Sequence, residues 1–365
     1  MKTSEFDYNL PTDLIAQKSI EPRDHSRCMV VDKKEQSIEH KHFYDIVDFL
    51  KVGDLLVWNN SKVFKARLFG RLESTDYDIN KDGVPDKPLL KQQEIEIFLV
   101  RPMENDGVWK VLGKPGRRLK PGMNVRFAED FYCTVMVKEP SGDILVEFPD
   151  DAEIVRAKAN KYGRIPVPPY VKDEPNQLEM YQTVYADENS EGSVAAPTAG
   201  FHFTSEIIEK LKTKGIEFSD VTLHVGLGTF LPVKSENVDD HTMHSEWVEL
   251  TQENADKINK AKQEGRRVIS VGTTTTRTLE GIAMLKNYED NKFEAFKGDI
   301  NLFIKPGFQF QVIDAMITNF HLPKSTLLML VGAFVGDKDF MLKCYETAVA
   351  ERYRFFSFGD AMFIF

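Results

Sequence analysis

The hydrophobic residues follow two different patterns along the chain of 365 residues. Between residues 65 and 148, β-branched and aromatic residues gather in six short runs separated by Gly, Pro, Asn and Asp, which is typical of an antiparallel sheet or a small barrel. The predicted strands span residues 66–72, 94–101, 107–111, 123–127, 132–138 and 144–148. The polar stretch of residues 76–92, which contains Gly83 and two prolines, is predicted to be an extended loop of this domain.

On either side of this region the pattern alternates between helix and strand. A short helix over residues 42–50 is predicted to precede a buried strand over residues 55–58. The later helices are predicted over residues 205–214, 252–264, 276–285, 324–334 and 340–352, and the later strands over 221–225, 267–271, 300–304 and 315–318. We therefore predict an α/β domain made of residues 1–64 and 150–365, interrupted by an all-β domain of residues 65–149.

The overall composition excludes several classes of protein. Apolar residues make up 42% and charged residues 28% of the chain, which fits a folded globular protein. The formal charge of −10 argues against a generally basic protein that coats nucleic acid. The three cysteines are too far apart in the sequence for a zinc knuckle or a disulfide framework, and they fit a reducing compartment.

The chain shows neither a secretion signal nor a membrane span. Its first residues carry acids where a signal peptide needs an apolar core. The longest apolar run, residues 327–335, is about half the length of a membrane span. We therefore expect a cytoplasmic protein that has no membrane partner.

One part of this acidic chain is locally basic. Residues 101–127 hold seven Lys and Arg against two acids, Glu104 and Asp106, which gives a net charge of +5. The Gly-Arg-Arg turn at residues 116–118, on a loop rich in Pro and Gly, is typical of a surface that contacts phosphate groups. A solvated rim of the β domain would give the same composition.

Three segments join small or hydroxyl residues to a strand end or a helix start. Residues 192–203, Gly-Ser-Val-Ala-Ala-Pro-Thr-Ala-Gly-Phe-His-Phe, would let a ligand approach the backbone closely. Residues 222–232 contain a Gly-x-Gly after a strand, but Leu231 stands where a dinucleotide fingerprint needs its third glycine. Residues 272–278, Gly-Thr-Thr-Thr-Thr-Arg-Thr, could cradle a carboxylate or a phosphate. Each segment also has a purely structural explanation. Residues 192–203 would be a buried loop, His224 in residues 222–232 would be a core histidine, and residues 272–278 would be an ordinary helix cap.

Histidines and one glutamate supply candidates for acid–base chemistry. His241 and His244 have the spacing of a metal-binding pair, but no recognisable ligand set completes it, so we expect no metal. His244, Glu246 and His321 are better candidates for general acid–base groups, because histidine titrates near neutrality and needs no metal.

Taken together, the motifs resemble one family. They run in one order from Phe6 to the C-terminus, at residues 6–11, 14–17, 21–24, 59–70, 114–122, 168–170, 181–186, 192–203, 222–232, 241–246, 271–280, 318–334 and 351–356. This set is similar to that of the S-adenosylmethionine:tRNA ribosyltransferase-isomerases of queuosine biosynthesis. The resemblance implies an α/β main domain of barrel-like character with an inserted small β-barrel domain.

The resemblance also implies a reaction and its partners. The ribosyl group of S-adenosylmethionine would be transferred and isomerised onto 7-aminomethyl-7-deazaguanine at the wobble position of a tRNA, and epoxyqueuosine-tRNA, adenine and methionine would be released. S-adenosylmethionine is then a consumed substrate, and no bound cofactor or metal is implied. The partners would be that tRNA and S-adenosylmethionine, and we expect the protein to be a monomer.

Candidate site residues follow from these motifs and from the implied chemistry. The acid–base candidates are His202, His224, His244, Glu246 and His321. The candidates for substrate binding are Arg23, Asn59, Asn60, Pro197, Thr198, Ala199, Gly200, Phe203, Gly226, Gly228, Thr229, Phe230, Thr273, Thr274, Thr275 and Arg277. The candidates for tRNA binding are Lys62, Lys114, Arg117, Arg118 and Lys120. Arg277 and the threonines before it are assigned to the methionyl carboxylate, and the small-residue loop is assigned to the nucleoside.

Two other functions remain as alternatives. A non-catalytic RNA-binding module would show decay of the loop motifs. An S-adenosylmethionine-dependent RNA methyltransferase would need a Rossmann-type glycine turn, which Leu231 and Pro232 interrupt. The chain departs from the family pattern at Met180, where an arginine is usual, so no RNA contact is expected there.

Overall fold

The computed structural model describes residues 1–79, 85–139, 142–172, 175, 177–225, 235–241, 243, 245–285 and 292–365. The chain forms two compact units. The larger unit comprises Met1–Lys62, Pro168–Glu174 and Gln182–Phe365, and the smaller unit comprises Val63–Val167 and Pro175–Tyr181. The predicted fold class, an α/β unit with an inserted all-β barrel, is confirmed.

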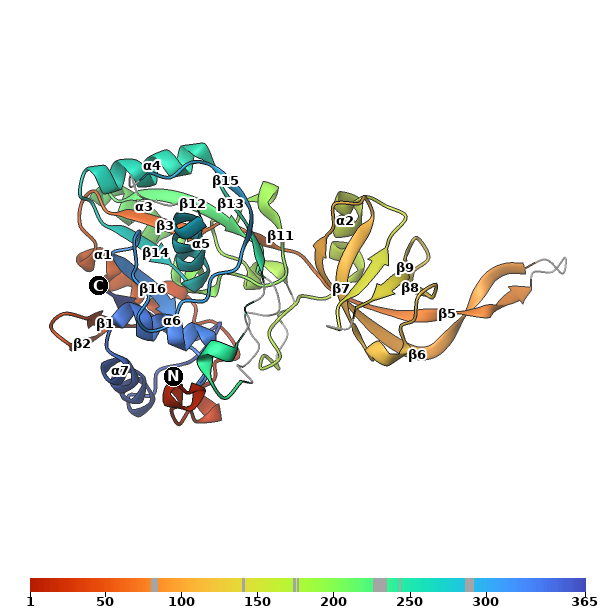
Figure 1. Ribbon diagram of the computed structural model, residues 1–365, viewed down its shortest axis with the longest axis horizontal. Helices are drawn as coiled ribbons and strands as arrows, with labels where there is room; N and C mark the ends of the chain where they lie inside the picture. Colours follow the sequence, from red (N-terminus) through yellow and green to blue (C-terminus); the bar gives the residue numbers. More distant parts are fainter. Residues whose placement is uncertain are drawn as a thin grey trace. The chain divides into compact units, whose positions relative to one another are not determined.

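The smaller unit is built on a closed barrel of six strands (Figure 1). These are β5 (Arg67–Ile79), β6 (Pro85–Pro102), β7 (Val108–Lys114), β8 (Asn124–Ala128), β9 (Phe131–Lys138) and β10 (Ile144–Glu147), which pair in the order β10-β7-β6-β5-β8-β9. Each predicted β run corresponds to one of these strands, because alternate apolar side chains, such as Val125 on β8 and Cys133 and Val135 on β9, fill the interior.

The prediction of an extended loop at residues 76–92 is wrong for residues 76–79 and 85–92, which lie in strands, and its residues 80–84 lie outside the described residues. β5 and β6 continue past the barrel as a two-stranded ribbon, in which Tyr77 pairs with Pro88 and Ile79 pairs with Pro85 (Figure 1). Proline is tolerated in a strand where its missing backbone N–H has no partner strand. The polar composition of residues 76–92 therefore led to the prediction of a loop where the chain forms two strands.

A helix after the barrel also belongs to the smaller unit. α2 (Ala152–Tyr162) is capped by the Asp151 carboxylate, and its Tyr162 stacks on Phe131 of β9. The helix buries Val155 and Ala159, and Lys158 forms an ion pair with Asp150. The smaller unit consequently runs on to Val167 and also includes Pro175–Tyr181, whereas the sequence placed its end at residue 149.

The larger unit is organised around a nine-stranded mixed sheet. Its strands, in spatial order, are β15 (Phe296–Ile300), β13 (Glu246–Leu250), β12 (Glu217–Leu223), β3 (Leu55–Asn59), β14 (Val268–Val271), β16 (Ala315–Asn319), β17 (Ala361–Ile364), β1 (Arg27–Asp32) and β2 (Ser37–His42). The four central strands β12, β3, β14 and β16 are parallel to one another, so their carboxyl ends share one edge of the sheet. Two further short strands are β4 (Lys62–Val63) and β11 (Glu191–Ser193).

The central strands are buried on both faces of this sheet. Leu55 and Val57 of β3 belong to one hydrophobic cluster, and Leu56 and Trp58 belong to another. The first cluster includes side chains of α4 (Gln252–Gln263), α5 (Thr273–Leu285), α6 (Thr326–Val335) and α7 (Lys338–Ala350), and the second includes those of α1 (Ile46–Phe49) and α3 (Ser205–Lys214). Helices therefore cover both faces, which explains the continuous apolar runs in these strands.

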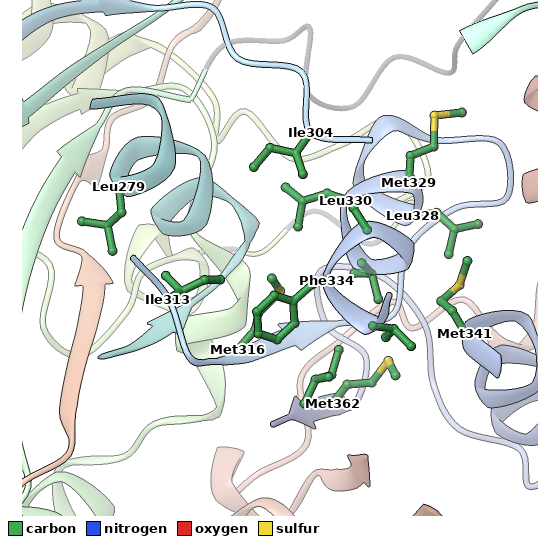
Figure 2. Close-up of a cluster of buried hydrophobic side chains, with 14 of the residues drawn as sticks. Leu279, Ile304, Ile313, Met316, Leu328, Met329, Leu330, Phe334, Met341 and Met362 are labelled. Atoms are coloured by element: carbon green, nitrogen blue, oxygen red, sulfur yellow. The ribbon is translucent and has the colours of Figure 1, made fainter. Parts of the chain in front are cut away.

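Figure 2 shows how the first cluster joins the helices to the sheet. Met316 of β16 and Met362 of β17 lie beneath α6, and Leu279 of α5 lies on the same side. α6 buries nearly every residue, including Leu330 and Phe334, because it is enclosed by neighbours rather than lying at the surface. None of the described helices has both the length and the apolar character that a membrane span requires.

Local end signals define the helices well. α3 spans the predicted residues 205–214, begins after the Thr204 cap and ends at Gly215 in the left-handed conformation (φ +90°). α5 begins at Thr273, earlier than the predicted residue 276, because Gly272 (φ +90°) turns the chain directly out of β14. Short 3-10 helices span Thr3–Phe6, Thr12–Leu14, Arg23–His25, Phe43–Asp45, Gly116–Arg118, Leu178–Tyr181, Glu188–Ser190, Thr198–His202 and Val238–Asp240.

Several strands were missed or shifted in the sequence analysis. β1, β2, β13 and β17 were not predicted, and β15 lies at 296–300 rather than at 300–304. β17 is a run of only four apolar residues, and so short a run does not distinguish a strand from a turn of buried helix.

Candidate active site

A cavity lies at the carboxyl edge of the parallel strands in the larger unit, next to the ends of β14 and β16. This is the edge at which open α/β sheets bind ligands. The lining residues are Tyr170, Ala196, Pro197, Thr198, Ala199, Val225, Gly272, Thr273, Thr274, Thr318, Asn319, Phe320, His321, Leu322, Ser325, Leu327, Phe356 and Ser357. We call this space the main cavity. Aromatic, aliphatic and hydroxyl groups dominate its lining, and its described lining residues include neither Asp, Glu, Lys nor Arg.

The small-residue loop forms one wall of the main cavity. Pro197, Thr198 and Ala199 line it directly. Gly200 faces away, and a Cβ added there would collide with the Tyr185 hydroxyl group. The loop therefore needs small residues for two reasons, since one part lines the cavity and another packs against the partly buried Tyr185.

The threonines at the start of α5 divide into two pairs. Thr273 and Thr274 line the main cavity. Thr275 donates to the Val271 carbonyl oxygen over 2.8 Å, and the Thr276 hydroxyl lies 3.2 Å from the Gly272 carbonyl oxygen. Thr275, one of the predicted binding residues, is thus bonded to the end of its own strand.

Arg277 and Glu246, two further candidates, are partners of each other. The Arg277 Nη1 donates to the Glu246 carboxylate, and its Nε donates to the Leu302 carbonyl oxygen over 3.2 Å. Both side chains are almost fully buried, and neither lines the main cavity. The pair joins α5 to β13.

Among the described candidate histidines, only His321 lines the main cavity. Its Nε2 lies 2.9 Å from the Thr318 hydroxyl group. Its backbone is held by two tyrosines, since Tyr8 donates to the His321 carbonyl oxygen over 2.5 Å and the His321 N–H donates to the Tyr345 oxygen over 3.3 Å. Burial lowers the pKa of His321 to about 3, so the ring is neutral at pH 7.

His202 lies behind the cavity wall. Its Nδ1 is 2.7 Å from the Ser26 hydroxyl, and its Nε2 is 3.4 Å from Nδ2 of Asn319. Burial, followed by the positive charges of Arg354 and Arg23, lowers the pKa of His202 to about 3. His202 is therefore a neutral ring that contacts a cavity residue rather than the cavity itself.

The remaining described candidate histidine, His224, follows β12. Its ring lies flat against Trp247, with centroids 4.9 Å apart and planes 10° apart, and it does not line the main cavity. His244 lies outside the described residues, as do Gly226, Gly228, Thr229 and Phe230.

Three predicted binding residues hold the fold together. The Asn59 side chain donates to the Leu223 carbonyl oxygen and accepts from the Leu223 N–H, at 3.0 and 3.1 Å. The Asn60 side-chain oxygen accepts from the Thr222 hydroxyl over 2.7 Å. Phe203 packs edge-on against Phe43 and Trp58 in the second hydrophobic cluster. These residues position β12 and the small-residue loop.

Arg23 lines a second, smaller cavity in the larger unit. Its lining residues are Ser19, Ile20, Arg23, Ser26, Phe201, His202, Arg354, Ser357, Phe358 and Gly359. This second cavity shares Ser357 with the main cavity and contains two guanidinium groups. Arg354 pairs with the buried Asp360 carboxylate at 3.3 Å.

Several cavity residues were missed in the sequence analysis, among them Asn319, Phe356 and Ser357. Asn319 lies in a motif that directly follows the predicted strand of residues 315–318, and this position at a strand end was the available signal. Phe356 and Ser357 come from the far C-terminal part of the chain, and no local pattern placed them at this edge.

The predicted basic residues of the smaller unit lie around the 3-10 turn of residues 116–118. Lys114, Arg117, Arg118 and Lys120 are exposed, whereas Leu119 is buried and anchors the turn to the barrel. Lys138 of β9 donates to the Gly116 carbonyl oxygen over 3.0 Å and adds a fifth exposed cation. We call these five residues the basic turn. Lys62, in the larger unit, forms an ion pair with Glu188.

Comparisons with known proteins cover the whole chain. The chain is 50% identical over 365 residues to an S-adenosylmethionine:tRNA ribosyltransferase-isomerase of Thermotoga petrophila, and all of both chains is covered. It is 47% identical over 365 residues to the protein of the same name from Natranaerobius thermophilus, covering all of this chain and 99% of that protein.

A solved structure is similar over nearly the same length. It is the crystal structure of S-adenosylmethionine tRNA ribosyltransferase from Thermotoga maritima, with a TM-score of 0.55 and 38% sequence identity, covering 99% of this chain and 100% of that chain. The family model described as queuosine biosynthesis protein matches residues 3–364. The chain therefore belongs to the queuosine biosynthesis protein family.

Proposed function

We propose that this protein is an S-adenosylmethionine:tRNA ribosyltransferase-isomerase. It transfers and isomerises the ribosyl group of S-adenosylmethionine onto 7-aminomethyl-7-deazaguanine at the tRNA wobble position, with release of adenine and methionine. The observation that carries this proposal is the identity of 50% along the entire chain to relatives of that name.

The main cavity supports this reaction through its chemistry. Apolar and aromatic side chains such as Tyr170, Phe320 and Phe356 suit a purine, and the hydroxyl groups of Thr273 and Thr274 suit a ribose. A lining with few charges also limits water around reactive intermediates.

The proposed route begins with removal of a proton from the carbon beside the sulfonium. The resulting ylide expels adenine and opens the sugar, and the tRNA amine condenses at the aldehyde. The ring then closes, and an alkoxide finally displaces methionine to form the epoxide. His321 is the described candidate acid–base group that lines the cavity, and its ring is neutral at pH 7. Glu246 is less suitable, because its carboxylate is occupied by Arg277.

The methionyl carboxylate needs a cation. Arg277 is bound to the buried Glu246 and does not line the main cavity, so we assign this role to Arg23 at the second cavity, which adjoins the main cavity at Ser357. Guanidinium groups suit carboxylates because they offer paired N–H donors.

The basic turn is proposed to contact the tRNA backbone. Its five exposed cations stand on a chain of net charge −10, so attraction to phosphate is local rather than general. The reaction needs no metal or bound organic cofactor, and we place the protein in the cytoplasm, where its tRNA substrate is found. We propose that it acts as a monomer.

One assay separates this function from the alternatives. The protein is incubated with S-adenosylmethionine and a tRNA that carries 7-aminomethyl-7-deazaguanine, and the nucleoside products are quantified. Free adenine supports the proposal, S-adenosylhomocysteine would indicate a methyltransferase, and neither product would indicate a binding module. The same tRNA with unmodified guanine is the control and should give no adenine.

A further inference from the structure

Asn319, the last residue of β16, has one side-chain polar atom without a hydrogen-bond partner among the described residues. Its side chain is buried at 3% exposure and lines the main cavity. Nδ2 lies 3.0 Å from the Phe356 carbonyl oxygen and 3.4 Å from Nε2 of His202. Oδ1 is buried and accepts no hydrogen bond from the residues that the structure describes.

The Phe356 carbonyl fixes the orientation of this carboxamide. A carbonyl oxygen can only accept, so it must face the Asn319 NH2 group rather than Oδ1. Rotating the carboxamide by 180° would place two oxygens against each other. Oδ1 is therefore the atom that remains for a ligand in the main cavity.

His202 supplies the second partner of the NH2 group. Because its ring is neutral, Nε2 can accept from Asn319 only if Nδ1 carries the proton, and Nδ1 then donates to the Ser26 hydroxyl at 2.7 Å. Ser26, His202 and Asn319 thus form a chain of hydrogen bonds that ends at the main cavity.

A buried acceptor that lacks a donor is unfavourable, so a ligand donor that reaches it gains affinity and specificity. Oδ1 is an acceptor only, whereas the threonine hydroxyls of the same cavity can either donate or accept. The complementary group is one that only donates. S-adenosylmethionine carries two such groups, the methionyl ammonium and the exocyclic 6-amino group of adenine. The apolar lining around Asn319 suits the uncharged purine rather than a cation.

We propose that Asn319 determines specificity for the adenine base, by accepting a hydrogen bond from the 6-amino group at Oδ1, and that His202 is the residue that positions Asn319. This inference rests on the proposed function, since it takes S-adenosylmethionine as the ligand. It gives His202 a positioning role rather than a catalytic one.

The test pairs enzyme variants with substrate analogues. Wild type and Asn319→Ala are assayed with S-adenosylmethionine and with its analogue that has hydrogen in place of the 6-amino group, and kcat/KM for base release is measured with the modified tRNA. Wild type should prefer S-adenosylmethionine by about tenfold, the range for one buried hydrogen bond. In Asn319→Ala, kcat/KM should fall about tenfold with S-adenosylmethionine and change less than about twofold with the analogue. The variant should therefore lose the preference for the 6-amino group.

A matched control separates this role from general damage. Asn259 is also a buried asparagine, its side chain bonds the backbone of Phe293, and it does not line the main cavity. Asn259→Ala should retain the preference for the 6-amino group whatever its effect on stability. Equal losses of Asn319→Ala with both substrates would overturn the proposal.

The positioning role of His202 has its own measurement. His202→Ala should reduce the preference for the 6-amino group, and His202→Gln, whose amide oxygen can accept from Asn319, should restore part of it. A preference unchanged in His202→Ala would overturn this role, because a merely structural histidine would alter stability alone.

Binding measurements distinguish failure of the inference from failure of the proposed function. If the wild type releases no adenine, the proposed reaction fails. Calorimetric titration of wild type and Asn319→Ala with S-adenosylmethionine and the analogue, without tRNA, then still tests the contact. If the wild type binds S-adenosylmethionine about tenfold more tightly than the analogue and Asn319→Ala does not, the contact is supported. If the wild type binds both ligands equally, the contact is refuted.

Discussion

Arg277 on α5 and Glu246 on β13 form an ion pair with both side chains almost fully buried. The pair joins a helix to an outer part of the sheet and lies outside the lining of the main cavity. Two residues that the sequence suggested for chemistry are therefore bound to each other, and their first effect is on stability.

Removing one partner of this pair should be strongly destabilising. Glu246→Ala leaves the Arg277 guanidinium buried without its carboxylate, and we expect the free energy of unfolding to fall by about 3–5 kcal/mol. The double variant Glu246→Leu with Arg277→Met removes both charges and should lose less than the sum of the single losses. Urea denaturation of Glu246→Leu, Arg277→Met and the double variant measures this, and strictly additive losses would contradict the pairing.

His321 should be needed for base release. His321→Ala is expected to lower kcat for adenine release by about 100-fold or more, because general acid–base groups contribute that much. His224→Ala is the comparison, since this ring packs on Trp247 away from the cavity lining. Adenine release at saturating substrates is the measurement. Equal effects of the two substitutions would remove His321 from its proposed role.

Stability should fall in acid because of His202. Its pKa is about 3 in the folded protein, against 6.5 for an unperturbed histidine. Between these pH values the unfolded chain binds a proton that the folded protein does not, so the free energy of unfolding drops as the pH is lowered through this window. The contribution is about 1.4 kcal/mol per pH unit well inside the window. His202→Gln should flatten this dependence in denaturation curves between pH 7 and pH 4, and an unchanged slope would contradict the assignment.

Gly200 should not tolerate a side chain. In Gly200→Ala the added Cβ collides with the Tyr185 hydroxyl, and we expect a loss of stability of about 1–3 kcal/mol from overpacking. Because the neighbouring residues 197–199 line the main cavity, the KM for S-adenosylmethionine should also rise. Adding Tyr185→Phe removes the nearest atom and should recover part of both losses. No recovery in thermal denaturation or in KM would speak against this contact.

Charge reversal in the basic turn should act on tRNA alone. Arg117→Glu with Arg118→Glu is expected to raise the KM for tRNA by about tenfold or more and to leave S-adenosylmethionine binding unchanged, with a weaker dependence on salt. Lys34→Glu with Lys210→Glu, at exposed positions of the larger unit, makes the same change in net charge and is the control. Normal tRNA binding by the basic-turn variant at physiological salt would identify this surface as a solvated rim.

Local signals determined most of the secondary structure from the sequence. The Thr204 cap and Gly215 fix the ends of α3, and the six β runs of the smaller unit each became a strand of the barrel. Prediction failed where the signal is not local. The β5–β6 ribbon has a polar sequence interrupted by prolines, and β17 is too short to show a period.

The sequence by itself determined the family, the two kinds of domain, and the loops that line the main cavity, because motifs and hydrophobic periods are properties of neighbouring residues. Only the tertiary structure decided which side chains face that cavity. The order of strands brings Asn319 of β16 beside His202 and Phe356, and it pairs Arg277 with Glu246 across 31 residues of chain. A side chain's role depends on such distant partners, and no local pattern specifies them.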